Sequence, residues 1–299
     1  RARKNSSGYA LDAWLASGDL VDLVVGAEGT LGVVTEVTWR LQPIPPARHT
    51  LRVALRALDD LGPAIEALHE LNPSAIELLD GTFLRFVADQ RPGGDADALA
   101  AVEALLLVEL EGEDAESLRR DAARARVLLG DRAARIEDAA SEEEAERLWA
   151  IRHAASPILA GLPDRQRSLQ VIEDGAVPVP RLGEYVAGLR AISARHGIPA
   201  VLFGHAGDGH LHVNLLPDIG AAGWQDAIAR IWEEAGALAL GLGGTPAGEH
   251  GDGRLRAPLV PRLFGTRVVS LFEAVRAACD PHGIMNPGVK TGTTRPEFD

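Results

Sequence analysis

Cysteine, long apolar runs and an excess of positive charge are scarce or missing in this 299-residue sequence. Cys279 is the only cysteine, so the chain alone forms no internal disulfide and holds no iron–sulfur cluster, and a lone thiol fits a reducing cytoplasm. No apolar run approaches the roughly 20 residues that a helix needs to span a bilayer. The net charge of −13 argues against nucleic acid and anionic membrane surfaces as general partners.

What is present is the composition of an ordinary globular protein, with 46% apolar and 24% charged residues. This length supports one large domain or two smaller ones with a full core. The chain opens on Arg1 rather than on methionine, and we expect a fragment that starts inside a domain. The proline-rich stretch 43–46 is the clearest candidate boundary, because prolines donate no N–H and favour extended structure.

Beyond that boundary, strand-like and helix-like patterns follow one another. Apolar residues alternate with arginines over 51–56 and run together over 105–110, as they do in strands. Helical spacing and capping residues predict helices over 61–68 and 114–129. This succession favours an open sheet with helices packed on one side.

A glycine-rich turn, Gly26-Ala27-Glu28-Gly29-Thr30-Leu31-Gly32, lies in the N-terminal part. It leads into an expected strand with Val37, Trp39 and Leu41 on one face. Such a loop beside a strand lets backbone N–H groups approach a phosphate or a cofactor edge. On spacing alone, a plain connection between strands is the better interpretation. Because no helix follows, the loop is not a dinucleotide fingerprint of the strand–loop–helix kind.

The stretch with the densest chemistry is residues 203–214, FGHAGDGHLHVN. It reads as a strand over 199–204, a turn with three glycines, and a second strand that begins at His210. Alternation sends apolar side chains to a core and polar ones to the opposite face, namely Leu211, Val213 and Leu215 against His210, His212 and Asn214. Histidines that meet across this turn suggest a metal site, which then needs a third ligand elsewhere.

Glu249, in the glycine-rich loop 241–254, is the leading candidate for that ligand. Two imidazoles and one carboxylate leave a coordination position open for substrate, as in catalytic zinc sites. Asp208 and Asp252 are alternatives, but Asp-Gly is ordinary turn chemistry and we favour that interpretation. His210 is most simply a neighbour on the polar face of its strand.

Arg152 lies on a helix that begins with a capping box at Ser141 and Glu144. It shares a stripe with Leu148, four residues earlier. An arginine there is either an anion ligand or a snorkelling side chain, and the residues alone favour snorkelling.

Five segments occur in an order that resembles a known family: RKNSSGY (3–9), GAEGTLG (26–32), GHAGDGHLHVN (204–214), EHG (249–251) and DPHGIMNPG (280–288). The chain resembles the FAD-linked oxidases of the vanillyl-alcohol oxidase (PCMH-type) superfamily, which include D-lactate dehydrogenase, the glycolate oxidase flavin subunit and D-2-hydroxyglutarate dehydrogenase. The resemblance implies an α+β fold. Residues 1–44 would be the tail of a PCMH-type FAD-binding domain, 45–290 an antiparallel sheet covered by helices, and 291–299 a linker.

The resemblance also implies site residues. The family's metal ligands match His205, His212 and Glu249. Asn214 matches an active-site amide, and His250 matches the proposed catalytic base.

Substrate and flavin contacts are implied in the same way. Arg152 matches the arginine that binds the substrate carboxylate, which reverses the preference for snorkelling. Gly29, Thr30 and Gly32 match flavin contacts, and Asn286 matches an amide near the isoalloxazine.

One departure bears on the substrate. The hydroxyglutarate enzymes have a lysine shortly before the aspartate that matches Asp174, and this chain has Ile172 there. A second substrate carboxylate would lack its usual partner unless Arg165 or Arg167 replaces it. The resemblance therefore favours a simple D-2-hydroxy acid such as D-lactate.

The expected protein is an FAD-dependent 2-hydroxy acid dehydrogenase, incomplete without the upstream FAD domain, with a divalent metal that is zinc, manganese or iron. We expect a cytoplasmic protein with an unknown electron acceptor, and leave peripheral association with a membrane open. A metal-dependent hydrolase and a non-catalytic flavoprotein subunit are the alternatives. The identity of the metal and the oligomeric state stay open.

Overall fold

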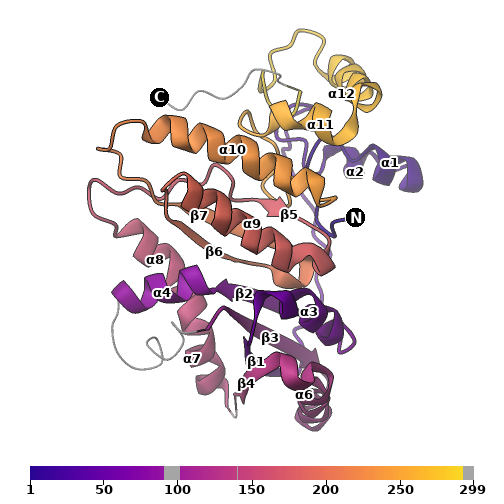
Figure 1. Cartoon of the computed structure of the whole chain (residues 1–299). Coiled ribbons are helices and arrows are strands. Elements are labelled where there is room, and N and C mark those ends of the chain that lie inside the picture. The colour runs from indigo at the N-terminus through magenta and orange to yellow at the C-terminus, as the bar shows by residue number, and fades with distance from the viewer. Residues whose placement is uncertain (91–101, 140, 292–299) are drawn as a thin grey trace.

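A computed structural model describes residues 1–90, 102–139 and 141–291 of the chain. Its centre is a seven-stranded sheet with the order β4-β1-β3-β2-β6-β7-β5, in which every neighbouring pair is antiparallel (Figure 1). The strands are β1 (Ala47–Leu55), β2 (Ala75–Asp80), β3 (Ala104–Gly112), β4 (Ala133–Asp138), β5 (Gly175–Ala176), β6 (Ala200–Gly204) and β7 (His210–Leu215). The antiparallel α+β fold is confirmed. The expected linker, apart from Thr291, lies outside the described residues.

Helices cover both faces of the sheet, so the expectation of helices on one side was wrong. One face carries α3 (Leu61–His69), α6 (Ala115–Leu129), α9 (Leu182–Arg195) and α10 (Trp224–Gly241). The other carries α4 (Gly81–Gln90), α7 (Glu142–His153) and α8 (Ala155–Ala160). The cause is visible in β3, where Leu106 and Val108 face the first layer and Leu105 and Leu107 face the second. A strand that is apolar on both faces has to be buried on both.

The two ends of the described chain form a third, smaller apolar cluster (Figure 1). Its helices are α1 (Leu11–Ser17), α2 (Leu20–Val24), α11 (Val260–Phe264) and α12 (Thr266–Cys279). Tyr9 meets Phe272 edge to face, with ring centroids 5.6 Å apart. The N-terminal segment is thereby fixed beside the C-terminal helices. No helix among the described residues has both the length and the apolarity that crossing a bilayer requires.

The strand expected over residues 37–41 does not form. Residues 33–46 have no regular structure, and Trp39 and Leu41 are 78% and 88% exposed. A strand is stable only when a neighbour satisfies its backbone N–H and C=O groups. None of the described residues pairs with this segment, so alternation alone did not make it a strand.

The turn between β6 and β7 has the backbone geometry that its glycines suggested. Gly209 has a φ of 68°, and Gly204 has a φ of 154° at a point where a Cβ would overlap the backbone of His210 and Leu211. The β7 alternation is also confirmed, because Leu211 and Val213 enter the larger core. The opposite face of β7 carries the polar side chains toward the candidate site.

Candidate functional site

Three imidazoles and one carboxylate converge beside the β6–β7 turn. Their potential ligand atoms, from His205, His210, His212 and Glu249, all lie within 4.8 Å of one another. The Nε2 atoms of His205 and His212 are 3.3 Å apart, and His205 Nε2 is 3.6 Å from Glu249 Oε2. In a tetrahedral site with bonds of about 2.0–2.1 Å, neighbouring ligand atoms are roughly 3.3–3.4 Å apart. The spacing therefore suits a divalent metal.

His205 is oriented by a carboxylate on β2. Its Nδ1 is hydrogen-bonded to Glu77, which also accepts a hydrogen bond from Arg152 Nε at 2.9 Å. Burial would raise the pKa of Glu77, but the hydrogen bond to His205 and the Arg152 charge outweigh burial and hold this pKa below its ordinary value. Arg152 thus lies next to the histidine cluster, with its guanidinium 4.7 Å from the centre of the Phe203 ring.

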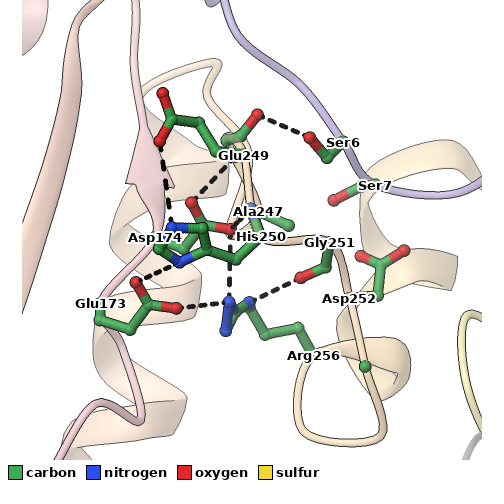
Figure 2. Close-up of polar contacts among 12 residues, drawn as sticks. Ser6, Ser7, Glu173, Asp174, Ala247, Glu249, His250, Gly251, Asp252 and Arg256 are labelled. Atoms are coloured by element: carbon green, nitrogen blue, oxygen red, sulfur yellow. Dashed lines mark hydrogen bonds and ion pairs between the residues drawn. The ribbon is translucent and has the colours of Figure 1, made fainter. Parts of the chain in front are cut away.

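Asp174 connects His210 to the loop that carries Glu249. This fully buried carboxylate lies 2.9 Å from His210 Nε2. It also accepts the backbone N–H groups of Glu249 and His250, both at 2.9 Å (Figure 2). Burial would raise the pKa of Asp174, but these hydrogen bonds and the charge of Arg256 keep it low. For His210, burial wins over Asp174 and lowers the pKa of the imidazole.

His250 is held by the neighbouring carboxylate, Glu173. His250 Nδ1 is 2.8 Å from Glu173 Oε2, and Arg256 donates to the other Glu173 oxygen at 2.7 Å (Figure 2). Burial lowers the pKa of His250, but Glu173 raises it more, so the net pKa lies above the ordinary value. The side chain is 50% exposed and stacks on His212. Its Nε2 lies 4.0 Å from Glu249 Oε2, so this nitrogen is the one on the same side as the imidazole cluster.

Asn214 follows His212 on the same face of β7. Its Oδ1 accepts a hydrogen bond from Ser168 Oγ at 3.0 Å. Its buried Nδ2 has no hydrogen-bond partner within the described part of the chain. The site therefore contains one amide N–H donor without a partner, and an oxygen atom of a bound ligand would accept its hydrogen bond.

The N-terminal segment reaches the site through Lys4. Its ammonium is hydrogen-bonded to Glu249 Oε1 and lies 3.1 Å from Asp208. Burial would raise the pKa of Glu249, but Lys4 and the imidazoles of His205 and His210 hold it below its ordinary value. Of the three acidic candidates, the structure brings only Glu249 to the imidazoles. Asp208 pairs with Lys4, and Asp252 is buried near Lys290.

Comparison with known proteins identifies the family. Residues 44–289 match the family described as FAD linked oxidases, C-terminal domain. The chain belongs to this family.

Two curated relatives show how much of a longer protein this FAD-linked oxidase chain covers. It is 32% identical to the glycolate oxidase subunit GlcD of Bacillus subtilis over 286 residues, which are 94% of this chain and 59% of that protein. It is 29% identical to a D-lactate dehydrogenase of Archaeoglobus fulgidus over 286 residues, which are 95% of this chain and again 59% of that protein. The chain thus spans less than two thirds of either relative.

Solved structures agree on the fold. A crystal structure of p-cresol methylhydroxylase with substrate bound superposes with a TM-score of 0.60 at 16% identity, over 84% of this chain and 54% of that one. At this identity the likeness shows a shared architecture alone.

The candidate flavin residues of this FAD-linked oxidase chain lie beside the Glu249 loop. The Glu28 carboxylate accepts the backbone N–H groups of Asp252 and Gly253 at 2.9 and 2.8 Å, and the Asn286 side chain donates to the Glu28 carbonyl at 2.7 Å. The structure thus brings three distant segments together around the glycine turn.

The three residues of that turn that are predicted to contact flavin differ in their exposure. Gly29 and Gly32 have open space where a Cβ would stand, so their backbone is accessible. Thr30 is fully buried, and its hydroxyl lies 2.6 Å from both the Tyr9 hydroxyl and the Ala27 carbonyl. Its side chain therefore supports the turn from inside.

Three acidic residues at the site were given no role in the sequence analysis. Glu77, Glu173 and Asp174 each meet an imidazole, at His205, His250 and His210. The available signal was an acidic residue inside the apolar run of β2, and an adjacent acidic pair before Gly175. Acidic groups in such buried positions have to be paired.

Proposed function

We propose that this chain is the substrate-side part of an FAD-dependent enzyme that oxidises a D-2-hydroxy acid to the 2-oxo acid at a divalent metal site. Residues 1–44 would belong to the FAD-binding domain and 45–290 to the substrate and metal domain. The observation that carries the proposal is the convergence of His205, His212 and Glu249, with His250 and Arg152 beside them. Both curated relatives named above act, by their names, on 2-hydroxy acids.

The residues present fit the two bound groups. His205, His212 and Glu249 would hold the metal, and they offer the nitrogen and carboxylate ligands that zinc, manganese and iron accept. The open backbone of Gly29 and Gly32, and the amide of Asn286, would lie against FAD. When bound, the metal lowers the pKa of a coordinated hydroxyl, and FAD accepts the hydride.

Arg152 would bind the substrate carboxylate. A guanidinium has five N–H donors in a fork, and Glu77 engages the Nε–H. The N–H groups on its two terminal nitrogens are suited to a bidentate contact with the carboxylate of a substrate. Asn214 Nδ2, the unpaired donor described above, would hydrogen-bond a substrate oxygen.

His250 would accept the proton of the substrate hydroxyl. Its Nδ1–H donates to Glu173, which leaves Nε2 as the basic nitrogen on the side of Glu249. A raised pKa makes Nε2 a stronger base. The α-carbon then loses its hydrogen as hydride, so the alcohol becomes a carbonyl and two electrons leave the substrate.

The surroundings of Ile172 support a small substrate. Ile172 packs against the main apolar core, and Arg165 is paired with Asp218 at 3.1 Å. Arg167 lies 3.4 Å from a carbonyl oxygen, that of Gln166. We therefore propose D-lactate or a similar monocarboxylate as the substrate class, with a separate and unknown electron acceptor.

Ligand variants of the full-length protein test the proposal. His205→Ala, His212→Ala and Glu249→Ala should each lose the metal and lose D-lactate oxidation with an artificial dye acceptor, while FAD stays bound. His196→Ala is the matched control, because this imidazole also bonds a carboxylate, Glu234 at 2.7 Å, outside the cluster. Ligand variants that kept full metal content would refute the assignment. Metal without flavin in the parent protein would indicate a hydrolase, and flavin without metal a non-catalytic subunit.

A further inference from the structure

His210 has a buried nitrogen without a hydrogen-bond partner. The side chain is fully buried, and its Nδ1 meets no donor or acceptor among residues 1–90, 102–139 and 141–291. Leaving such an atom unsatisfied destabilises the folded state, because burial removes it from the water that would otherwise hydrogen-bond it. Orphaned buried polar atoms are rare, and each one calls for a bound ion, a water molecule or a functional reason.

The chemistry of this nitrogen follows from the other side of the ring. His210 Nε2 is 2.9 Å from the Asp174 carboxylate, which also accepts two backbone N–H groups and can only accept. Nε2 therefore carries the hydrogen, and Nδ1 presents a lone pair. A lone pair in a closed site needs a donor or a cation.

Nδ1 faces an acceptor instead of a donor. The carboxylate oxygen Glu249 Oε2 lies 3.9 Å from Nδ1. The His210 ring is stacked with that of His205 and lies edge to face with that of His212, with centroids 5.4 and 4.7 Å apart. Lone pairs of nitrogen and oxygen thus point into one small space, and a cation between them would satisfy them together.

The three imidazoles share one arrangement. Each turns one nitrogen toward its own carboxylate, His205 to Glu77, His210 to Asp174, and His212 to Glu173 at 3.7 Å. Each turns its other nitrogen toward Glu249 and the remaining imidazoles. A carboxylate behind an imidazole is the usual way in which proteins orient a metal-bound histidine.

The loop before Glu249 is built around His210. A Cβ at Gly248 would overlap the His210 imidazole, so the loop closes over the ring only because residue 248 has no side chain. The Gly248 N–H also donates to the Asp174 carbonyl at 2.7 Å. The position of His210 is therefore fixed from two sides.

We infer that His210 is a fourth protein ligand to the metal of the proposed site, through Nδ1. This inference rests on the proposed function. Three imidazoles and one carboxylate fill four positions, so a bound 2-hydroxy acid has to raise the coordination number to five or six. Zinc can expand to five ligands, and manganese and iron readily take six.

The test compares metal binding by variants of the full-length protein. Apo protein, prepared with a chelator, is titrated with zinc against a chromophoric chelator, and X-ray absorption at the zinc edge counts the bound imidazoles. The loss of an outer-shell partner costs about 10–100-fold in metal affinity, so the loss of His210 should cost at least about 100-fold. His210→Asn and His210→Gln are both made, because glutamine can keep the bond to Asp174. His196→Asn is the control.

We expect three zinc-bound imidazoles in the parent protein and two in the His210 variants. The variants should also show the loss of zinc affinity. Two imidazoles in the parent protein, or variants that bind zinc within about threefold of the parent, would overturn the inference and leave the proposed function intact. A parent protein that binds no metal would end both. If neither variant folds, the imidazole count of the parent protein decides.

Discussion

Lys290 offers the sharpest test of how the ends of the chain are held to the site. Its side chain is fully buried, and its ammonium donates to the carbonyls of Ser6 and Gly8 at 2.9 and 2.7 Å. It also lies 3.0 Å from Glu28 and 3.4 Å from Asp252. One cation thus joins the N-terminal segment, the glycine turn and the Glu249 loop.

Lys290→Met removes the charge and keeps most of the side-chain volume. Removing one partner of a buried ion pair costs about 3–5 kcal/mol, because the other charge stays buried without compensation. With a urea m-value of about 2–3 kcal/mol/M, the unfolding midpoint should fall by about 1–2.5 M. Arg254→Met is the control, because Arg254 is exposed and donates to the nearby Pro287 carbonyl. Equal midpoints for the two variants would show that the buried ammonium of Lys290 does not stabilise the fold.

The destabilisation by Lys290→Met should also depend on pH. Burial raises the pKa of Asp252 above its ordinary value of 3.8, and the charge of Lys290 opposes that shift. Without Lys290 the pKa rises further. A carboxyl whose pKa is raised in the folded state does not destabilise the protein while it is protonated. As the pH rises through that pKa, the carboxyl loses its proton more easily in the unfolded state, so the free energy of unfolding falls. The variant should therefore lose more stability at pH 8 than at pH 4.5, and Asp252→Asn in the same chain should remove that difference.

Three further predictions concern the site in the full-length protein. His250→Asn should keep metal and FAD but slow single-turnover flavin reduction by about 10²–10⁴-fold, and a metal-replete variant with normal reduction would exclude His250 as the base. The rate of flavin reduction should increase with pH as His250 loses its proton, because the base acts when deprotonated. Glu173 raises the pKa of His250 above 6.5, so Glu173→Gln should move this increase to lower pH. An unchanged pH profile would contradict this prediction. Gly248→Ala should weaken metal binding by displacing His210, whereas Gly241→Ala, where a Cβ meets open space, should not.

Local patterns predicted the parts of the fold that depend on local chemistry. The β6–β7 turn and the face that carries His212 follow from glycines and alternation within a dozen residues. The helix cap at Ser141 also formed as expected, with Glu144 N–H donating to its hydroxyl. The segment 33–46 failed because a strand depends on a partner, and no local pattern supplies one.

The part of the site that lies within one short stretch of sequence was also predictable. The imidazoles of His205 and His212 come from one hairpin, so their meeting was foreseeable. Glu77 and Asp174 approach them from elements that are distant in the sequence, and only the assembled sheet brings them there. His210 was placed on the correct face, but its burial depends on the loop at Gly248 and could not be read from its own strand.

We propose that this site oxidises a 2-hydroxy acid only with a metal in place. The most direct measurement mixes the full-length, FAD-loaded protein with D-lactate without oxygen and follows the bleaching of the flavin band, before and after a chelator removes the metal. We expect rapid bleaching, its loss on metal removal with FAD still bound, and its return when the ion is restored. Bleaching at the same rate in metal-free protein would contradict this proposal.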